Sequence, residues 1–274
     1  MPQQAEPPDH RAPGDAAAPE PGDAPAAAGR PVDAVLFDFH GTLAQVEEPI
    51  AWVLAAASTC GVDLERGRAT ILADRLVTAG RAGGPVPGRV PPHLAEMWAD
   101  RDLYPHVHRA VYVGLAATVE AGVEGLAEAL YERILLPEGW LPYADTGPTL
   151  RSLHAAGIPV AVVSNIGFDI RPLFDAWGLT DLVSTWALSY EVGRCKPDPN
   201  IFLGACAALH ADPRRTLMVG DTPSDAAAVR AGCPTLVLPA ADPGGVNGLA
   251  AALRLAGLDG AAGPGVDQVG PGVD

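Results

Sequence analysis

The sequence predicts an α/β fold in which a doubly wound, Rossmann-like parallel sheet carries an inserted, all-helical cap domain. Two observations lead to this prediction. Short apolar runs rich in β-branched residues alternate with helical patterns, which is typical of strands buried on both faces of a parallel sheet. In addition, one long interval after the first run contains helical patterns without a convincing strand.

The predicted strands are short, apolar throughout and separated by helical segments. They cover Ala34–Phe37, Ile158–Val163, Leu182–Leu188, Thr216–Val219 and Thr235–Leu238. Helices are expected between them at Thr149–Ala156, Ile170–Trp177, Asn200–Leu209 and Ser224–Ala231. Because strands and helices alternate, we expect an α/β core formed by residues 31–46 and 138–256.

The cap is predicted at residues 47–137, where the alternation of strands and helices is interrupted. Its helices are expected at Ile50–Cys60, Leu64–Ala79, His93–Leu103, His106–Val119 and Gly125–Leu136, with a Gly/Pro-rich loop at Gly80–Pro92. A helical block inserted after the first strand of an α/β core can close over an active site as a lid.

The two ends of the chain have a different composition from the rest. Residues 1–30 and 257–274 are rich in Pro, Ala, Gly and acidic residues and show no periodicity. Such segments bury too little apolar surface to offset the entropy lost on ordering. Both ends are therefore predicted to be disordered tails.

The overall charge limits the classes of partner. The chain has 33 acidic and 18 basic side chains, a formal net charge of −15, which disfavours binding to nucleic acid or to an anionic membrane. The N-terminus lacks the pattern of a secretory signal, and no apolar run approaches the roughly 18 residues of a spanning helix. With four scattered cysteines, a cytoplasmic protein with reduced thiols is expected. The oligomeric state stays open.

Polar side chains follow several of the predicted strands. They are Asp38 after the first strand, Ser164 and Asn165 after the second, Lys196 in the segment after the third, and Asp221 and Asp225 after the fourth. Because ligands of open α/β sheets bind at the carboxyl ends of the strands, we expect these side chains to converge on one rim.

The chemistry that suits such a rim is phosphoryl transfer. A carboxylate can attack phosphorus as a covalent nucleophile and so divide hydrolysis into two steps. The attack brings two anions together, so a divalent cation with hard oxygen ligands is needed to neutralise them. A hydroxyl, backbone N–H groups and a lysine can then stabilise the phosphoryl oxygens.

Four ordered motifs resemble those of the haloacid dehalogenase superfamily. They are Asp38-Phe-His-Gly-Thr-Leu43, Ser164-Asn165, Lys196-Pro-Asp-Pro199 and Gly220-Asp-Thr-Pro-Ser-Asp225. The resemblance extends over residues 32–257, and the helical insert is similar to the cap of one subclass.

The resemblance implies a role for each matching residue. Asp38 would be the nucleophile, Ser164 and Lys196 would hold the phosphoryl group, and Thr42 and Asn165 would contact the substrate. Mg²⁺ would be bound by Asp38, Asp221 and the backbone carbonyl of His40, with Asp225 as a further ligand or as support for one. The resemblance thus implies a Mg²⁺-dependent phosphatase that acts on a small phosphorylated metabolite through an aspartyl-phosphate intermediate.

His40 departs from the usual pattern of these phosphatases, which carry a second aspartate at this position for proton transfer. Three interpretations remain open. The imidazole transfers the proton, which its ordinary pKa of about 6.5 permits; or the protein is similar to dehalogenases that attack carbon; or the fold serves binding or regulation with weak catalysis. Asp221 and Asp225 disfavour the dehalogenase, because carbon–halogen displacement needs no metal, and we favour the phosphatase.

The cap segment Trp98–Arg109 concentrates aromatic and basic residues in an otherwise acidic chain. Arg101 and His108 lie at helix-face spacing, interrupted at Pro105. This face is a candidate for contact with the substrate. The alternative is an aromatic helix face that packs on its neighbours and leaves its charges in solvent.

Overall fold

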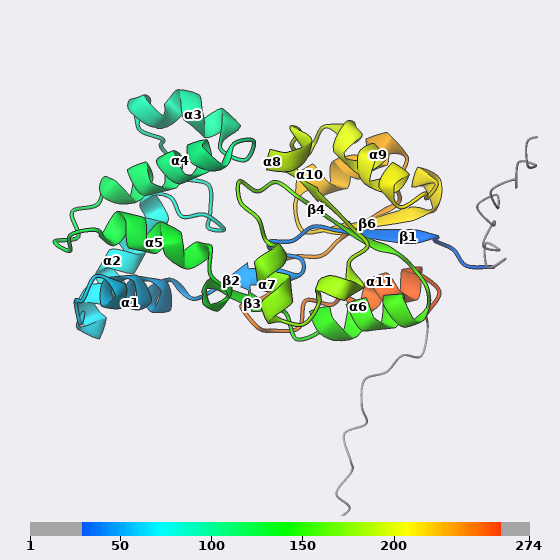
Figure 1. Ribbon diagram of the computed structural model, residues 1–274, viewed down its shortest axis with the longest axis horizontal. Coiled ribbons are helices and arrows are strands. Elements are labelled where there is room, and N and C mark those ends of the chain that lie inside the picture. Colours follow the sequence, from blue (N-terminus) through cyan, green and yellow to red (C-terminus); the bar gives the residue numbers. More distant parts are fainter. Residues whose placement is uncertain (1–28, 259–274) are drawn as a thin grey trace, which may run out of the picture.

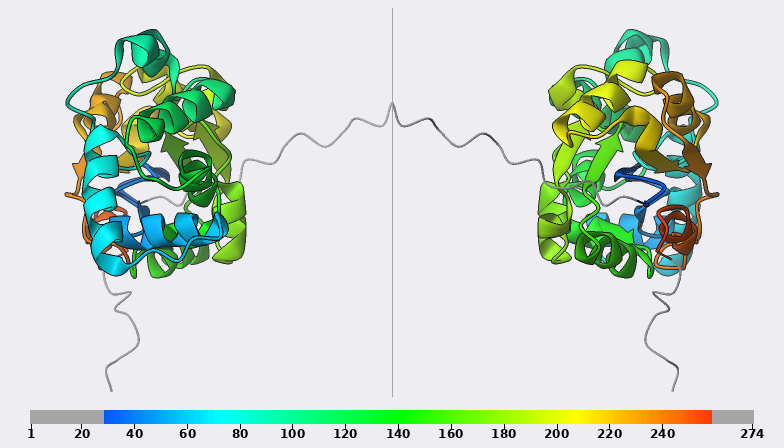
Figure 2. Two further views of the ribbon diagram at one scale, coloured as in Figure 1. Left: turned by 90° about the vertical axis from the view of Figure 1, so that its left-hand side faces the viewer. Right: turned by 90° about the vertical axis from the view of Figure 1, so that its right-hand side faces the viewer.

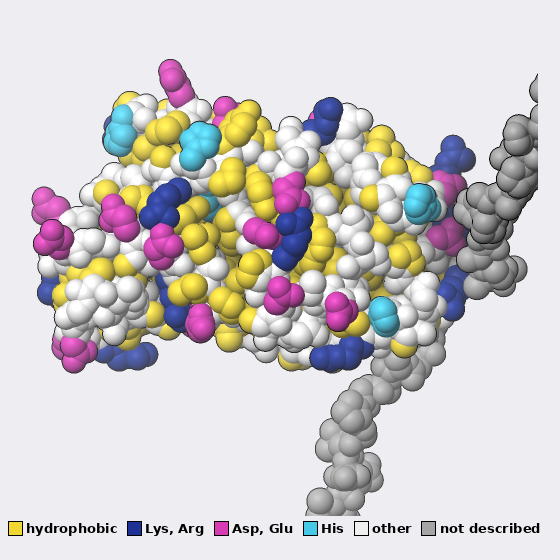
Figure 3. Space-filling view, in the orientation of Figure 1, with side chains coloured by type: hydrophobic (Ala, Val, Ile, Leu, Met, Phe, Trp, Pro, Cys, Tyr) yellow, Lys and Arg dark blue, Asp and Glu magenta, His cyan; other side chains and the backbone are white. Residues whose placement is uncertain are grey.

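The computed structural model describes residues 29–258. The tails predicted at 1–30 and 257–274 therefore lie almost wholly outside the described residues. Within the described range the chain forms two parts side by side, a sheet flanked by helices and a group of helices at one end of it (Figure 1). No helix in the described range is long and apolar enough to cross a bilayer. Acidic and basic side chains are interspersed over the face shown in Figure 3.

The core sheet has five parallel strands in the order β5-β4-β1-β6-β7. They are β1 (Ala34–Phe37), β4 (Val160–Ser164), β5 (Thr185–Leu188), β6 (Thr216–Gly220) and β7 (Thr235–Val237). Every residue of β1, β4 and β6 is buried, as expected of strands covered on both faces. The predicted parallel α/β fold is confirmed.

Two predicted strands begin later than expected. The apolar run from Leu182 begins in a 3₁₀ turn, Thr180–Leu182, and the strand starts at Thr185. In the run from Ile158, the N–H of Ile158 donates to the carbonyl of Leu153 in the preceding helix, and the strand starts at Val160. In both places a local turn hydrogen bond takes the backbone group that a strand would need.

Helices cover both faces of the sheet (Figure 2). On one face, α6 (Thr146–Ala155), α7 (Arg171–Ala176) and α11 (Ala250–Leu255) pack on alternate strand residues such as Val35 and Val162. On the other face, α9 (Pro199–Ala208) and the 3₁₀ helix Ala227–Ala231 pack on the intervening residues, for example Leu36 and Val163. The alternation of side chains along each strand divides the core into these two layers.

Five further α-helices form the helical insert, by which we mean the segment between β2 and β3. They are α1 (Pro49–Thr59), α2 (Arg66–Ala79), α3 (Ala95–Asp100), α4 (Pro105–Ala117) and α5 (Leu126–Ile134). They have apolar clusters of their own, one of them around Trp52, Leu72 and Leu130. Local signals fix their ends: the Glu65 carboxylate accepts from two N–H groups at the start of α2, and α4 begins at a proline.

Two short strands mark where the chain enters and leaves the insert, and the sequence did not indicate them. β2 (Ala44–Val46) and β3 (Trp140–Pro142) pair antiparallel, with Val46 opposite Trp140. Each has only three residues, and glutamine in β2 and proline in β3 interrupt the apolar run that would identify a buried strand. The pairing places the two crossing segments side by side.

A part-buried ion pair braces this junction. The Glu47 carboxylate accepts from Nε and Nη2 of Arg133 on α5, at 2.7 and 3.1 Å. Arg133 also donates to the carbonyl of Glu138 in the returning segment. The guanidinium of Arg81, which stacks on Trp52, donates to the carbonyl of Glu47. One glutamate therefore links both crossing segments to the insert.

Replacement of Glu47 by alanine should lower the free energy of unfolding by about 2 kcal/mol, because Arg133 loses a charged acceptor in a half-buried place. The neighbouring Glu48 is exposed, so Glu48→Ala should change stability by less than about 0.5 kcal/mol. Urea unfolding of the two variants measures the difference. Equal losses would show that the ion pair does not brace the junction.

Candidate active site between the sheet and the helical insert

A cavity of about 330 Å³ lies at the carboxyl ends of the core strands, where the helical insert meets the sheet. Asp38, His40, Ser164, Asn165 and Lys196 line it from the core, and Arg101, Asp102, His108 and Tyr112 from the insert. Its volume is that of a site for a small molecule.

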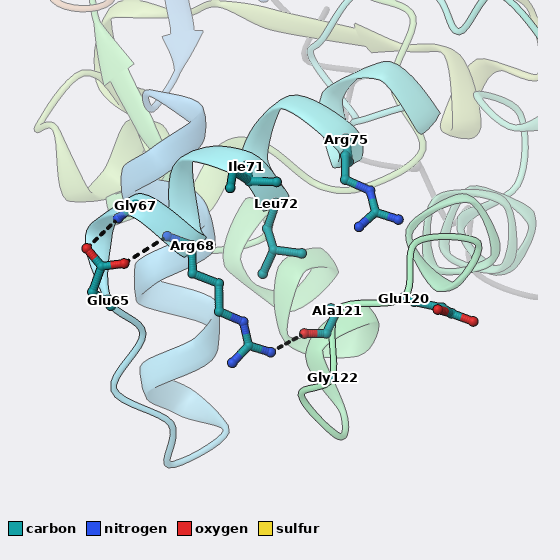
Figure 4. A pocket seen from close by; sticks show the side chains of 9 residues that line it. All are labelled: Glu65, Gly67, Arg68, Ile71, Leu72, Arg75, Glu120, Ala121 and Gly122. Atoms are coloured by element: carbon teal, nitrogen blue, oxygen red, sulfur yellow. Dashed lines mark hydrogen bonds between the residues drawn. The ribbon is translucent and has the colours of Figure 1, made fainter.

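A larger groove, of about 730 Å³, lies on the outside of the insert between α2 and the turn before α5 (Figure 4). Glu65 caps α2 there, and Arg68 donates to the carbonyl of Ala121. The groove is open to solvent, and two of its charged side chains, Glu65 and Arg68, bond to backbone groups of a helix end and a turn. None of its lining residues is among the polar residues at the strand ends, so we place the candidate site in the smaller cavity.

Strand geometry brings the first carboxylate to the rim. The N–H of Asp38 donates to Val219 and continues the pairing of β1 with β6 past the end of the strand. The chain then turns at Gly41, whose φ is 83°. A side chain at Gly41 would place its Cβ 2.3 Å from Oδ2 of Asp221. Only glycine combines this conformation with so close an approach to a carboxylate.

Lys196 lies at the centre of the polar cluster and is buried. Its Nζ donates to Oδ1 of Asp38 at 2.5 Å, to Oδ1 of Asp225 at 2.6 Å and to the carbonyl of Val163 at 2.9 Å. Burial opposes its charge, but the two carboxylates outweigh burial and raise the pKa of Lys196. The three bonds use the three protons of the ammonium group.

Asn165 fixes the backbone of Lys196. Its Oδ1 accepts from the Lys196 N–H at 2.7 Å, and its Nδ2 donates to the Lys196 carbonyl at 2.9 Å. The amide therefore positions the lysine. Contact of Asn165 with a substrate stays a prediction, as does that of Thr42, whose buried hydroxyl lies 3.4 Å from Oδ2 of Asp38.

Asp225 is fully buried, and protein groups satisfy both of its oxygens. Oδ1 accepts from Lys196, and Oδ2 accepts from the N–H and the hydroxyl of Thr222 at 3.0 and 2.5 Å. Burial would raise its pKa, but Lys196 and Thr222 together lower the pKa of Asp225 below the usual range. These contacts suit an ionised carboxylate that supports the cluster.

Carboxylate oxygens of Asp38, Asp221 and Asp225 lie within 4.8 Å of one another. Burial raises the pKa of Asp38 to about 7, although Lys196 opposes the shift. Burial and the charge of Asp225 raise the pKa of Asp221 to about 6. Oδ1 of Asp221 is buried and has no hydrogen-bond partner among the described residues. A close set of hard oxygen donors that includes an unpaired buried oxygen fits a divalent cation such as Mg²⁺.

His40 lines the same cavity as Asp38, and Gln45 holds its ring. Nε2 lies 2.6 Å from Oε1 of Gln45, and this oxygen also accepts from the N–H of Val46 at 3.0 Å. Oε1 is therefore the acceptor, and Nε2 of His40 carries the proton. Burial lowers the pKa of His40, although the bond to Gln45 opposes the shift. The imidazole is thus neutral near pH 7, and its Nε2–H is already engaged.

The two substrate-contact candidates of the insert both lie in the cavity wall and also pack on aromatic rings. The guanidinium of Arg101 stacks on Trp98 at 4.1 Å. Nδ1 of His108 lies 2.9 Å from the hydroxyl of Tyr131, and burial together with the charge of Arg101 lowers the pKa of His108 to about 3. The structure therefore shows the packed face, and contact of Arg101 and His108 with a substrate stays a prediction.

Asn247 and Asp145 support the turn after Asp38, and the sequence did not single them out. Nδ2 of Asn247 donates to the carbonyls of Gly41 and Thr42 at 3.1 and 3.0 Å. The Asp145 carboxylate accepts from the N–H groups of Asn247, Gly248 and Leu249. These bonds join segments about 100 or 200 residues apart along the chain, so no local pattern indicates them.

The raised pKa values give the metal-free protein a defined dependence on pH. Asp38 and Asp221 bind protons more tightly in the folded state than in the unfolded chain, so stability is lost as pH rises from about 4 to about 7. In chelator, Asp221→Asn should therefore raise the melting temperature by about 3 °C near pH 8, the shift that roughly 1 kcal/mol gives in a chain of this size.

Near pH 5 the same substitution should have a smaller effect, because Asp221 is already mainly protonated there in the folded protein. Thermal unfolding of wild type and Asp221→Asn at both pH values is the measurement. A stabilisation of equal size at both would contradict the raised pKa.

Comparisons with known proteins agree with this geometry. Residues 32–232 match the haloacid dehalogenase-like hydrolase family. The chain is 31% identical over 99 residues to haloacid dehalogenase-like hydrolase domain-containing protein 3 of Danio rerio, covering 36% of this chain and 41% of that protein. It is 30% identical over 103 residues to phosphoglycolate phosphatase of Salmonella typhi, covering 37% of this chain and 41% of that protein. The chain thus spans about two fifths of the length of these curated relatives.

Two solved structures share the fold over most of their length. A dehalogenase superposes with a TM-score of 0.56 at 20% identity, over 82% of this chain and 96% of that one. A HAD phosphatase from Thermococcus onnurineus superposes with a TM-score of 0.50 at 23% identity, over 81% of this chain and 97% of that one. With the family match over most of the chain, and with the four motifs gathered at one cavity, the protein belongs to the haloacid dehalogenase-like hydrolases.

Proposed function

We propose that this protein is a Mg²⁺-dependent phosphatase that transfers the phosphoryl group of a small phosphomonoester to Asp38 and then to water. The observation that carries the proposal is the buried cluster in which Lys196 joins Asp38 to Asp225, while Oδ1 of Asp221 has no hydrogen-bond partner within residues 29–258. Relatives named phosphoglycolate phosphatase support a phosphorylated substrate.

Each residue of the cluster takes a role that its contacts suit. Asp38, on the cavity surface, is the nucleophile. Lys196 keeps Asp38 oriented and offsets part of the negative charge, and Ser164, at the end of β4, faces the same cavity for contact with the phosphoryl oxygens. Such preorganised polar groups stabilise charge in the transition state.

The cation would be held by Asp38, Asp221 and the backbone carbonyl of His40, with Asp225 in support. When bound, it supplies positive charge that reduces repulsion between the carboxylate and the phosphoryl group. Carbon–halogen displacement needs no cation, and two further carboxylates would repel a haloacid anion. The acidic cluster therefore favours the phosphatase over a dehalogenase.

The substrate is expected to be small, because the cavity of about 330 Å³ is closed on one side by the insert. Arg101 and His108 are proposed to contact its organic part, Arg101 as a cation and His108 as a neutral ring.

A cytoplasmic location is proposed as well. Its support is that all four cysteines are free thiols, including Cys206 and Cys233, whose sulfurs are 3.8 Å apart.

Asp38→Asn should abolish phosphate release from phosphomonoesters and leave the fold intact, because the amide has almost the same volume but is not a nucleophile. Phosphate release with Mg²⁺ and circular dichroism measure the two parts. The exposed Asp181 provides the matched control, and Asp181→Asn should keep wild-type turnover.

The same panel of substrates should contain simple haloacids, with halide release as the readout. More than a few per cent of wild-type phosphatase activity in Asp38→Asn would contradict the covalent mechanism. Halide release that depends on Asp38, without phosphate release, would identify a dehalogenase instead.

Mg²⁺ should raise the melting temperature of the wild type, because an ion that binds only the folded state stabilises it by mass action. At a concentration of about 100 times the dissociation constant the gain is about 2.7 kcal/mol. Asp221→Asn should show much less of this shift, and Asp181→Asn should show all of it. The same shift in all three proteins would place the ion away from Asp221.

A further inference from the structure

The proposed phosphatase needs a group that gives a proton to the leaving oxygen, and few groups in the cavity wall are suited to this. His40 has its Nε2–H engaged by Gln45. His108 is bonded to Tyr131, and burial keeps its pKa at about 3. The hydroxyl of Tyr112 is a weak acid, because burial raises its pKa to about 12. Lys196 has all three protons in hydrogen bonds.

Two of the residues that line the cavity have carboxyl groups, Asp38 and Asp102. Asp38 is the proposed nucleophile. Asp102 belongs to the helical insert, in the turn between α3 and α4. It therefore lies in the wall of the cavity that the insert provides, whereas Asp38 lies in the wall that the sheet provides. Carboxyl groups commonly serve as proton donors and acceptors in hydrolases.

The core holds Asp102 in a defined place. Ser189 is buried directly after β5, and its hydroxyl donates to the backbone carbonyl of Asp102 at 2.5 Å. The same oxygen accepts from the N–H of Ile166 at 2.8 Å, two residues after Ser164. Asp102 is thus connected to the end of β4 through one buried hydroxyl, although it belongs to the insert. This bond fixes the backbone of Asp102, and a fixed backbone helps to hold a catalytic side chain in place.

The charges around Asp102 come from both parts of the molecule. Arg101 lies beside it, with Nη2 3.2 Å from Oδ2. Lys196 and Cys195 face it from the core and Tyr112 from α4. Burial raises the pKa of Asp102, although Arg101 and Lys196 oppose the shift. The group can thus hold a proton more readily than an exposed aspartate, and Arg101 can stabilise the carboxylate that remains after the proton leaves.

In-line displacement determines which wall the leaving oxygen faces. The attacking and the leaving oxygen lie on opposite sides of phosphorus. With Asp38 attacking from the sheet, the leaving oxygen points toward the insert. The water that later attacks the phosphorylated Asp38 approaches from this same side, because displacement of Asp38 is also in line.

We propose that Asp102 is the proton donor and acceptor of this site, in the role that an aspartate at position 40 has in related phosphatases. The proposal rests on the proposed phosphatase activity. In the first step Asp38 bonds to phosphorus, the bond from phosphorus to the alcohol oxygen breaks, and the proton of Asp102 passes to that oxygen. In the second step water attacks phosphorus, its proton passes to Asp102, and the bond from phosphorus to Asp38 breaks, which releases phosphate.

The leaving group provides the test. An alkyl ester leaves as a strong base and needs the acid, whereas 4-nitrophenyl phosphate leaves readily without it. In single-turnover measurements with Mg²⁺, Asp102→Asn should slow cleavage of an alkyl phosphate by about 10²- to 10⁴-fold. Cleavage of the aryl ester should slow by less than about 10-fold. Because the second step also loses its base, the variant should show a burst of 4-nitrophenol equal to the enzyme concentration.

Three further variants make the assignment specific. Asp102→Glu keeps the acid and should recover part of the alkyl ester rate. Asp100→Asn changes an exposed aspartate in the same segment and should match the wild type. His40→Gln should affect both esters to the same degree. Melting temperatures verify that each variant is folded.

Equal losses on both esters in Asp102→Asn, or rates equal to those of Asp100→Asn, would overturn the role of Asp102 and leave the phosphatase standing. A dependence on the leaving group in His40→Gln but not in Asp102→Asn would give the role to His40. If the wild type cleaves neither ester, the phosphatase itself is wrong, and the role of Asp102 is overturned with it.

Discussion

The structure of the site depends on one buried ammonium group. Asp38 follows β1, and Asp225 lies in the short helix α10 (Pro223–Ala226) after the neighbouring β6; together they would place two carboxylates in a region with little solvent. Lys196 lies between them and bonds to both, which makes their burial possible, because buried charges are tolerated where they are paired and hydrogen-bonded. Its third bond, to the carbonyl of Val163, fixes the lysine to β4. Three neighbouring strands are thereby connected through a single side chain.

This arrangement explains why Asp221 differs from its neighbours. Lys196 has no proton left for Asp221, and Oδ1 of Asp221 has no hydrogen-bond partner among the described residues. The cluster thus contains one carboxylate that is held ionised by the protein, Asp225, and two whose pKa values are raised. Lys196 bonds to Asp38 and Asp225, so Asp221 receives no hydrogen bond from it, and a cation is proposed to bind between Asp221 and Asp38.

The sequence predicted the parts of the fold that depend on local pattern. The apolar runs identified the five core strands, and the polar residues at their ends, such as Asp38 and Ser164, meet at one cavity as parallel topology requires. β2 (Ala-Gln-Val) and β3 (Trp-Leu-Pro) escaped prediction because neither belongs to an apolar run rich in β-branched residues. Asn247 and Ser189 escaped as well, because their contacts join segments that only the tertiary structure brings together. Asp102 shows no distinguishing pattern in the sequence; its environment arises from the docking of the insert on the core.

The pairing of β2 with β3 has a consequence for how the protein can vary. Adjacent strands lie about 4.8 Å apart, so the chain leaves the core and returns to it at nearly the same point. For the core, the whole insert is equivalent to a long hairpin loop, and the cost of closing such a loop grows only slowly with its length. Helices of the insert can be lengthened, lost or exchanged without altering the register of β1 between β4 and β6. The part of the cavity wall that the insert provides can therefore diversify while the carboxylate cluster stays unchanged.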